Sequence, residues 1–214
     1  MNNYVVLAKL TDLQLAFVII VPIVVLLFLV IALYFPISGA YRRKYFQIHF
    51  YKQVYRVALD CDYYLINQYI FKVDNSKNAT VDHILFGNKY IYTIISKYYQ
   101  GDLIGKYADK SLIFISHKGK KHYTDNPYNE AKYLTSKLSS STGIDASLMI
   151  GIILINDDCK VAVQSESKQF YIIQRKRLPA LIKAIESRPV ENINETQLEK
   201  AVQSIAKQNK RKRQ

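Results

Sequence analysis

The sequence predicts an α/β protein with one N-terminal transmembrane helix, then a mixed sheet flanked by helices, then a C-terminal helix. Three observations predict this fold class. A long uncharged apolar stretch lies near the N-terminus, strand-like apolar runs alternate with segments of helical periodicity in the middle, and apolar residues recur at helical spacing near the C-terminus. At roughly 150 residues per domain, a chain of 214 residues holds one domain with appendages.

The composition excludes several classes of protein. Two Cys are too few for a disulfide framework or a Cys-rich zinc site, and seven Gly with five Pro exclude a collagen-like or a Pro/Gly-rich disordered chain. Eighteen Tyr and nine Phe can fill a hydrophobic core, so the chain is expected to fold. The formal net charge of +13 points to an anionic partner or a membrane surface.

Residues 14–37 are expected to form the transmembrane helix. No charged residue lies between Leu13 and Tyr41, and a helix over the apolar residues 15–37 is long enough to cross a hydrocarbon core of roughly 30 Å. A cleaved signal peptide is the main alternative, because Ser38-Gly39-Ala40 supplies small residues at a plausible cleavage position. The apolar stretch exceeds the usual length of about 7–15 residues in a signal peptide, which favours a retained anchor. A buried core helix rarely runs this long without a polar residue.

The flanking charges predict the orientation of this helix. Lys9 is the only basic residue before it, whereas Arg42, Arg43 and Lys44 follow it closely. Because basic flanks stay on the cytoplasmic side, residues 1–13 are expected to be a short extracytoplasmic N-terminus and residues 38–45 a basic juxtamembrane linker. The predicted location is the cell membrane, with a single pass and a cytoplasmic C-terminal domain.

Residues 46–187 are expected to form one α/β domain. The spacing of apolar residues predicts a helix over 46–59, and Gly87-Asn88 predicts a hairpin turn between two of the strands. Asn126 as N-cap and Pro127 at the first helical position predict a helix start, and the helix should end at 139–143. A further short helix is expected over 178–185. Strands are expected at residues 69–73, 81–86, 90–95, 112–115, 148–155, 161–163 and 170–173.

Residues 188–214 are expected to form an amphipathic helix and a basic tail. Asn194 can cap this helix, and Leu198, Val202 and Ile205 recur at helical spacing. The tail ends in Lys210, Arg211, Lys212 and Arg213, a run that suits a polyanion or simple solvation.

The sequence contains none of the common catalytic motifs. A Gly-rich phosphate loop, Cys-x-x-Cys, His-Glu-x-x-His and Gly-x-Ser-x-Gly are all missing, and the four His are scattered, as polar surface or capping residues are. One pair is informative. Asp82 opens one strand of the predicted hairpin and Lys97 ends the other, an arrangement in which a carboxylate holds a divalent cation and a lysine steadies the attacking water or the phosphate. The alternatives are a turn Asp and a solvated edge Lys.

Three blocks of residues resemble the NERD (nuclease-related domain) family, which is related to the PD-(D/E)-x-K restriction-endonuclease-like fold. They are Val81-Asp82-His83, the strand and Gly-containing turn over residues 92–101, and the helix start Asn126-Pro127-Tyr128. The resemblance covers roughly residues 46–185 and implies a restriction-endonuclease-like mixed sheet, with Asp82 and Lys97 as the catalytic candidates.

Two departures from the family pattern imply a degenerate active site. The family's Glu-x-Lys reads Ile95-Ser96-Lys97, and the acid of a Gly-Glu pair in the first helix is replaced where the alignment places Tyr51-Lys52. No Glu precedes Glu130, so Asp82 is the one expected carboxylate, and Asp102 or Glu130 can substitute only if the fold brings them there. Catalytic function is therefore expected to be vestigial, and no metal-ligand set is predicted.

The function expected from these features is a membrane-anchored, catalytically degenerate module that binds DNA or RNA at the cytoplasmic face. Lys118, Lys120 and Lys121 in a basic turn, with the C-terminal basic run, are the nucleic-acid-binding candidates. One alternative is an active nuclease with a rearranged site, which would need Mg or Mn; otherwise no cofactor is expected. The other is a membrane scaffold protein whose charge contacts anionic lipid. The protein partners are not predicted.

Overall fold

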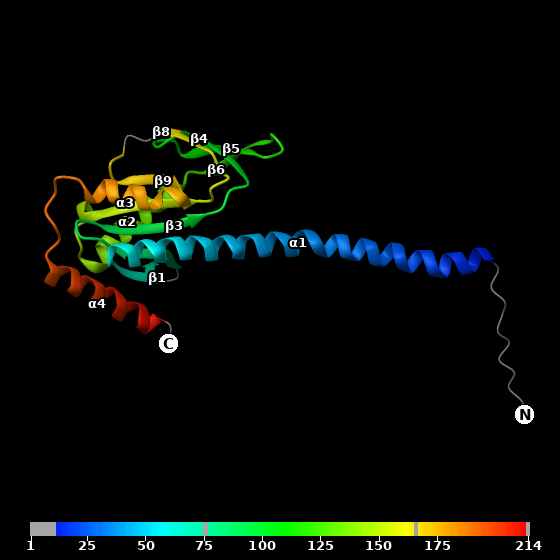
Figure 1. Ribbon diagram of the computed structural model, residues 1–214, viewed down its shortest axis with the longest axis horizontal. Coiled ribbons are helices and arrows are strands. Elements are labelled where there is room, and N and C mark those ends of the chain that lie inside the picture. The colour runs from blue at the N-terminus through cyan, green and yellow to red at the C-terminus, as the bar shows by residue number, and fades with distance from the viewer. Residues whose placement is uncertain (1–11, 75–76, 165–166, 213–214) are drawn as a thin grey trace, which may run out of the picture. The chain divides into compact units, whose positions relative to one another are not determined.

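The computed structural model describes residues 12–74, 77–164 and 167–212 (Figure 1). The chain forms two compact units, Met1–Tyr45 and Phe46–Gln214. The helices are α1 (Asp12–Cys61), α2 (Pro127–Thr142), α3 (Leu178–Glu186) and α4 (Glu195–Lys212), with short 3-10 turns at Ala146–Leu148 and Arg175–Arg177. The strands are β1 (Tyr64–Asp74), β2 (Lys77–Phe86), β3 (Ile91–Lys97), β4 (Gly101–Lys106), β5 (Ser111–Ser116), β6 (Lys121–Asp125), β7 (Met149–Ile155), β8 (Val161–Gln164) and β9 (Phe170–Gln174).

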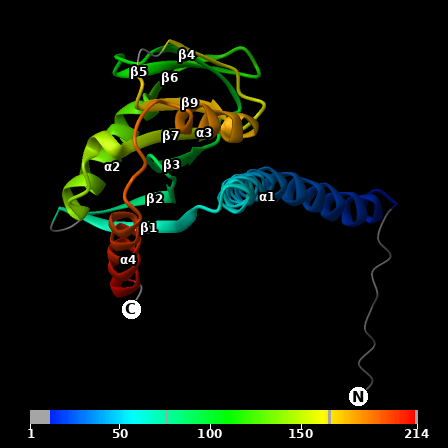
Figure 2. The ribbon, with the colours of Figure 1, turned by 60° about the vertical axis from the view of Figure 1, so that its left-hand side comes forward.

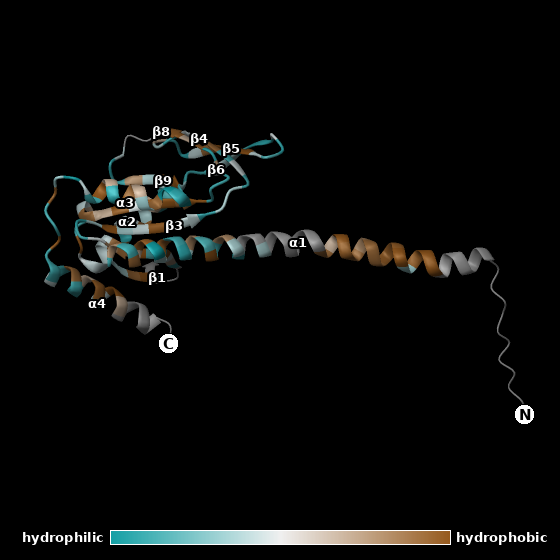
Figure 3. Ribbon diagram, in the orientation of Figure 1, coloured by the Kyte–Doolittle hydropathy of each residue, from teal (hydrophilic) through white to brown (hydrophobic). Residues whose placement is uncertain are grey.

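The N-terminal unit contains the first part of α1. Residues 19–33 of this helix are apolar and exposed to solvent, and they form the brown stretch in Figure 3. Across the part of the chain that the structure describes, no helix combines the length and the apolar character needed to span a membrane. The transmembrane helix predicted over residues 14–37 is therefore not supported.

The larger unit is built on a five-stranded mixed sheet in the order β1-β2-β3-β7-β9. The first three strands form an antiparallel meander. After β4, β5 and β6, helix α2 leads to β7, which lies parallel to β3. β9 continues the parallel part beside β7. The predicted mixed sheet flanked by helices is confirmed in this unit, as is the predicted hairpin between β2 and β3.

Helices cover both faces of this sheet (Figure 2). One face packs against α3 and the C-terminal part of α1, through buried residues such as Phe50, Val54 and Ile182. The other face packs against α2 and α4, through residues such as Leu134, Leu138 and Ile205. Every residue of β7 is buried, as expected for a central strand with helices on both sides.

A second sheet, which the sequence did not predict, has the order β6-β5-β4-β8. Both views place it on the β9 side of the main sheet (Figures 1 and 2). The chain reaches it directly from β3, and Gly101, expected to lie in a turn, begins β4 instead. A Cβ at Gly101 would collide with the backbone of Ile115 on the paired strand, so the close approach of β4 and β5 requires glycine here.

The start of α2 is as the sequence predicts. Asn126 is the N-cap, and its side chain accepts a hydrogen bond from the backbone N–H of Tyr128. The helix ends at Gly143, whose φ of 71° is left-handed and whose N–H donates to the carbonyl of Ser139. This helix start lies beside the end of β3, since Glu130 in its first turn pairs with Lys97.

Candidate functional site

The candidate site begins where β2 and β3 diverge. The two strands pair from Phe86 and Ile91 as far as His83 and Ile94, and β3 then continues to Lys97 paired with β7 only. At this point the Oδ2 atom of Asp82 accepts a hydrogen bond of 2.7 Å from the backbone N–H of Ser96. The Asp82 carboxylate therefore takes the place of a backbone carbonyl as the acceptor for the N–H of Ser96. This bond holds Asp82 beside Ser96, the residue that precedes Lys97.

The end of β3 is joined to the start of α2 by an ion pair. The Nζ atom of Lys97 lies 2.6 Å from Oε2 of Glu130, and the two side chains are 34% and 45% exposed. Glu130 lies in the first turn of α2, where the helix dipole favours a negative charge. The sequence left open whether Asp102 or Glu130 would supply a second carboxylate near Asp82. In the fold, Glu130 is the residue that does so.

Asp82, Lys97 and Glu130 form one electrostatic group. Burial raises the pKa of Asp82, whereas the Ser96 N–H and the charge of Lys97 lower it, and the negative charge of Glu130 raises it again. Two carboxylates consequently share one lysine. We call these three residues the charged triad.

Two members of the charged triad, Lys97 and Glu130, line a pocket of about 480 Å³. Lys97 and Tyr99 reach it from the end of β3, Glu130 and Asn129 from the start of α2, and Lys110 and Asp125 from the second sheet and its loops. The pocket wall thus carries two ammonium groups and two carboxylates. Burial, then the charges of Glu130, Cys159 and Asp125, raise the pKa of the Tyr99 phenol to about 12, so this hydroxyl is a neutral hydrogen-bond donor at pH 7.

Two buried asparagines hold the walls of this pocket in place. The Nδ2 atom of Asn126 donates to the carbonyl oxygens of Lys106, Tyr107 and Asp109 at 2.7–3.3 Å, which ties the β4–β5 loop to the start of α2. Asn156, which follows β7, accepts from the N–H of Tyr99 and donates to its carbonyl, both at 2.9 Å. The pocket is therefore preorganised by buried polar contacts.

A family model for the nuclease-related domain (NERD) matches residues 46–156, just over half of the chain. The chain belongs to the NERD family. No curated protein and no solved structure matches it. Membership confirms the predicted resemblance and makes this a nuclease-related module, and the mixed sheet is consistent with the restriction-endonuclease-like fold.

Ile95 stands where the resemblance to the NERD family led us to expect a metal-binding Glu. Ile95 is 4% exposed and packs in the hydrophobic core beneath α2. Among the described residues, no group of three or more His, Cys, Asp or Glu is placed to hold a metal ion. Magnesium is commonly held by one or two carboxylates together with phosphate and waters. Asp82 and Glu130 are the two carboxylates near Lys97 that would contribute to holding such an ion.

One expectation about a residue near the site is wrong in the NERD domain, and one alternative that the sequence left open is not realised. His83 was expected at the surface or in a cap, but it is 5% exposed, it hydrogen-bonds through Nδ1 to Oδ1 of Asn67 at 2.6 Å, and its ring lies near Tyr51. Asp102 does not reach the charged triad. It lies in β4 of the second sheet, where its Oδ1 accepts from the N–H of Lys160.

The basic candidates lie apart from the pocket or outside the described side chains. Lys118 and Lys120 are exposed in the β5–β6 turn and Lys121 is exposed at the start of β6. Lys44 is exposed on α1 in the N-terminal unit. The side chains of Arg42, Arg43, Lys210, Arg211 and Lys212 lie outside the described part of the structure, as does the whole of Arg213.

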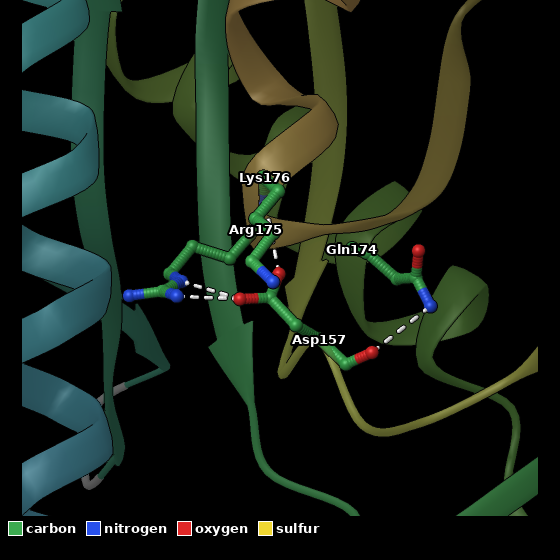
Figure 4. Close-up of polar contacts among 4 residues, drawn as sticks. All are labelled: Asp157, Gln174, Arg175 and Lys176. Carbon is green, nitrogen blue, oxygen red and sulfur yellow. Dashed lines mark hydrogen bonds and ion pairs between the residues drawn. The ribbon is translucent and has the colours of Figure 1, made fainter.

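A second polar network braces the same end of the main sheet, where the parallel strands β7 and β9 finish (Figure 4). The carboxylate of Asp157 accepts from Nε and Nη2 of Arg175 at 3.0 and 2.5 Å and from the N–H of Lys176. Gln174 donates from its side chain to the carbonyls of Asp157 and Cys159. The charge of Arg175 is paired with that of Asp157 within the domain, which makes this contact a structural one.

Sequence reasoning missed Lys110, Asp125 and Asn129 as pocket residues. Asp125 and Asn129 flank the Asn126-Pro127 helix start that the sequence did reveal, and this proximity was the one available signal. Lys110 carries no sequence signal, because it reaches the pocket only through the second sheet, which was not predicted.

Proposed function

We propose that this NERD domain binds nucleic acid at the charged triad and its pocket, and that it does not cleave it. The observation that carries the proposal is the Lys97–Glu130 ion pair on the wall of one pocket, with Asp82 electrostatically coupled to both, in a domain where the buried Ile95 stands at the position expected for a metal-binding Glu. The site retains Lys97, which can bind a phosphate. It lacks the usual pair of metal-binding carboxylates on adjacent strands, because Ile95 stands where the second one is expected.

The β5–β6 hairpin supports binding of a longer polyanion. Lys118, Lys120 and Lys121 are exposed on it, and Tyr123 on the same hairpin is 83% exposed. Lysines neutralise phosphates and an exposed aromatic ring can stack on a base, so the hairpin suits DNA or RNA.

Active cleavage is the second candidate, and Glu130 is the observation that favours it. Glu130 pairs with Lys97, and its charge acts on Asp82. Asp82 and Glu130 together would then hold the Mg or Mn ion that activates water, with Lys97 steadying the phosphate.

One experiment separates these functions. The purified full chain is incubated with labelled single- and double-stranded DNA and RNA, at low and moderate salt, with manganese or with EDTA. We expect salt-sensitive binding without cleavage. Cleavage that requires manganese and is lost in Asp82→Ala would establish the second candidate instead, and the absence of both binding and cleavage would leave a scaffold role.

The contribution of the hairpin is tested by replacing Lys118, Lys120 and Lys121 with Gln together. The slope of log affinity against log salt on double-stranded DNA should become shallower by up to about 3, because each lost phosphate contact removes about 0.9 from the slope. The matched control replaces three other exposed lysines, Lys168, Lys183 and Lys200, and should leave the slope unchanged.

We also propose that residues 14–37 anchor the protein in the cell membrane with the NERD domain in the cytoplasm. The uncharged sequence between Leu13 and Tyr41, the exposed apolar residues 19–33 and the basic residues Arg42, Arg43 and Lys44 support this location. The test is extraction of cell membranes with alkaline carbonate. An anchored protein stays in the membrane pellet, and release into the supernatant contradicts the proposal.

A further inference from the structure

The second sheet has one face that packs into the domain and one that does not. The inner face packs through the buried Leu103 and Leu112 and through the partly buried Phe114 and Val161. Of the helices in the described part of the chain, none lies over the opposite face in either view of the ribbon (Figures 1 and 2). We call this opposite face the outer face. It carries the residues that alternate with the buried ones along each strand.

A row of exposed apolar side chains crosses the outer face. Tyr123 of β6 lies opposite Ile113 of β5. Ile113 lies opposite Ile104 of β4, which in turn pairs with Ala162 of β8. Tyr123 is 83% exposed, Ile104 is 38% exposed and Ile113 is 37% exposed, and Ala162 is exposed as well. With about 4.8 Å between neighbouring strands, these four residues form a row roughly 14 Å long, which we call the apolar row.

Lysines border the apolar row on both sides. Lys121 lies two residues before Tyr123 on β6, and Lys106 lies two residues after Ile104 on β4, so both belong to the outer face. β4 and β6 are both antiparallel to β5 and therefore run in the same direction, which places the two lysines on opposite sides of the row. Both residues are exposed.

The outer face carries more positive than negative charge. Lys118 and Lys120 are exposed in the turn that joins β5 to β6 and add to the two bordering lysines. Two carboxylates occur on the same face, those of Asp102 and Asp125, and Asp102 already accepts a hydrogen bond from the backbone N–H of Lys160. A ligand that matches this face has apolar surface in its middle and negative charge on both sides.

An unpaired nucleic-acid strand has this combination of surfaces. Its bases have flat faces that stack on an aromatic ring, and its phosphates follow at every nucleotide. A face of four strands has room for about two or three such bases. In a duplex the base faces are stacked on one another, so a duplex would use the lysines and leave the apolar row without a partner. The outer face therefore fits a single strand better than a duplex.

Charge and size disfavour a second copy of the chain as the occupant. A symmetric dimer through the apolar row would bring the lysines of both copies to one interface, where like charges repel. A row one side chain wide is also far smaller than the roughly 800 Å² per partner that a stable interface buries.

We propose that the outer face of the second sheet binds an unpaired segment of DNA or RNA. One base stacks on Tyr123, its neighbours lie over Ile113 and Ile104, and phosphates lie beside Lys106 and Lys121. This inference rests on the proposed function, to which it adds a preference for single strands and a surface outside the pocket.

The first test places a fluorophore on the apolar row. The chain contains no Trp, so Tyr123→Trp in the full chain gives one Trp that reports contact with a base. The probes are unlabelled single-stranded DNA, single-stranded RNA and duplex DNA of about 12 nucleotides. We expect single strands to quench the emission and the duplex to change it little. The matched control is Tyr133→Trp, at a position on α2 that is 45% exposed, and it should not respond. Equal quenching in the two variants, or equal quenching by duplex and single strands, overturns the inference.

The second test measures affinity by fluorescence anisotropy with labelled forms of the same probes. Tyr123→Ala should reduce the affinity for single strands at least about fivefold and that for the duplex less than about twofold, with Tyr123→Phe retaining most of the affinity. Lys106→Gln should reduce the slope of log affinity against log salt on single strands by about 0.7, as expected for one lost phosphate contact. Tyr133→Ala is the control. Equal losses for duplex and single strands in Tyr123→Ala overturn the inference.

The variants also separate this inference from the proposed function. Salt-sensitive binding of single strands and duplex alike, unchanged in Tyr123→Ala, refutes the outer-face site and leaves binding at the charged triad. Single-strand binding that is lost in Tyr123→Ala and unchanged in Lys97→Gln supports the outer face and refutes binding at the charged triad. Absence of binding by every probe refutes both. A dimer in sedimentation that Tyr123→Ala dissociates, without nucleic-acid binding, assigns the apolar row to self-association and overturns the inference.

Discussion

At the residue scale, two neighbours on β2 are both held toward their neutral forms. Burial raises the pKa of Asp82 and lowers the pKa of His83 to about 4. Burial raises the pKa of an acid and lowers that of a base, because a low-dielectric surrounding disfavours the charged form of either. The Asp82 carboxylate keeps compensating contacts to the Ser96 N–H and to Lys97, whereas for His83 burial is the sole cause of the shift.

The first prediction concerns the pH dependence of stability through His83. The unfolded chain binds a proton on this His with a pKa of about 6.5, above the folded value of about 4. Its stabilising contribution is therefore complete above pH 6.5 and is lost as the pH falls from 6.5 through 4, by about 3 kcal/mol. Urea denaturation at several pH values should show a shallower decline for His83→Gln than for the wild type. His117→Gln, at an exposed position, should follow the wild type, and a shared decline in all three proteins contradicts the assignment.

The second prediction concerns Lys97, whose ion pair with Glu130 is one third to one half exposed. Lys97→Gln should change the free energy of unfolding by less than about 1 kcal/mol, because solvent screens such pairs. The same change should reduce the slope of log affinity against log salt on double-stranded DNA by about 1, as expected for one lost phosphate contact. Binding titrations at four salt concentrations measure this slope, and an unaltered slope would exclude Lys97 from the interface.

At the scale of the elements, α2 positions the site. Its start is fixed by the four hydrogen bonds of the Asn126 side chain, and its first turn carries Glu130 to Lys97. The start of α2 thus forms one wall of the pocket and also supplies Glu130, the ion-pair partner of Lys97.

The third prediction follows from this role of Asn126, which is 1% exposed. Asn126→Ala leaves three partly buried carbonyl groups and one helix N–H without this partner, so the free energy of unfolding should fall by about 2–3 kcal/mol. Asn129→Ala, on the exposed side of the same turn, should cost less than about 0.5 kcal/mol. Chemical denaturation of the two variants makes the comparison, and similar losses in both would refute the capping argument.

Local sequence signals predicted the elements that depend on local chemistry. The β2–β3 hairpin at Gly87 and the α2 start at Asn126 both carry turn or cap residues, and both predictions are confirmed. β4 and β6 were missed for physical reasons. β4 contains two glycines, and β6 is a polar edge strand whose five residues are all at least partly exposed, so neither shows an apolar strand pattern.

The candidate site was predictable only in part, for a related reason. Asp82 and Lys97 lie on adjacent strands of one hairpin, so their proximity follows from local pairing. The Lys97–Glu130 pair depends on how α2 packs across the sheet, and the contribution of Lys110 depends on the second sheet. Packing of this kind has no signature in a single sequence.

At the scale of the whole molecule, the folded domain extends beyond the family match. The match ends at residue 156, yet β9, α3 and α4 complete the two hydrophobic cores. Ile205 on α4 is fully buried in the core that also contains Phe71 of β1. The C-terminal helix is therefore part of the fold.

The fourth prediction tests this role of α4. Ile205→Ala should lower the free energy of unfolding by about 2–4 kcal/mol, because it opens a cavity in a packed core. Val190→Ala removes apolar atoms from a side chain that is 43% exposed and should cost less than about 0.5 kcal/mol. Thermal unfolding should separate the two variants by several degrees, and equal midpoints would mean that α4 adds little to stability.

The second sheet is assembled from two stretches of chain that lie on either side of α2 and β7, since β4, β5 and β6 precede them and β8 follows. During folding, the ladder between Leu103 and Val161 cannot close until α2 and β7 have bridged that gap, and closing so long a loop is slow. In pulse-labelled refolding, the amides of this ladder should gain protection after those of the β2–β3 hairpin. The β8 edge of the second sheet should therefore form after the local β4–β5–β6 strands, so a partly folded chain would hold this sheet incomplete.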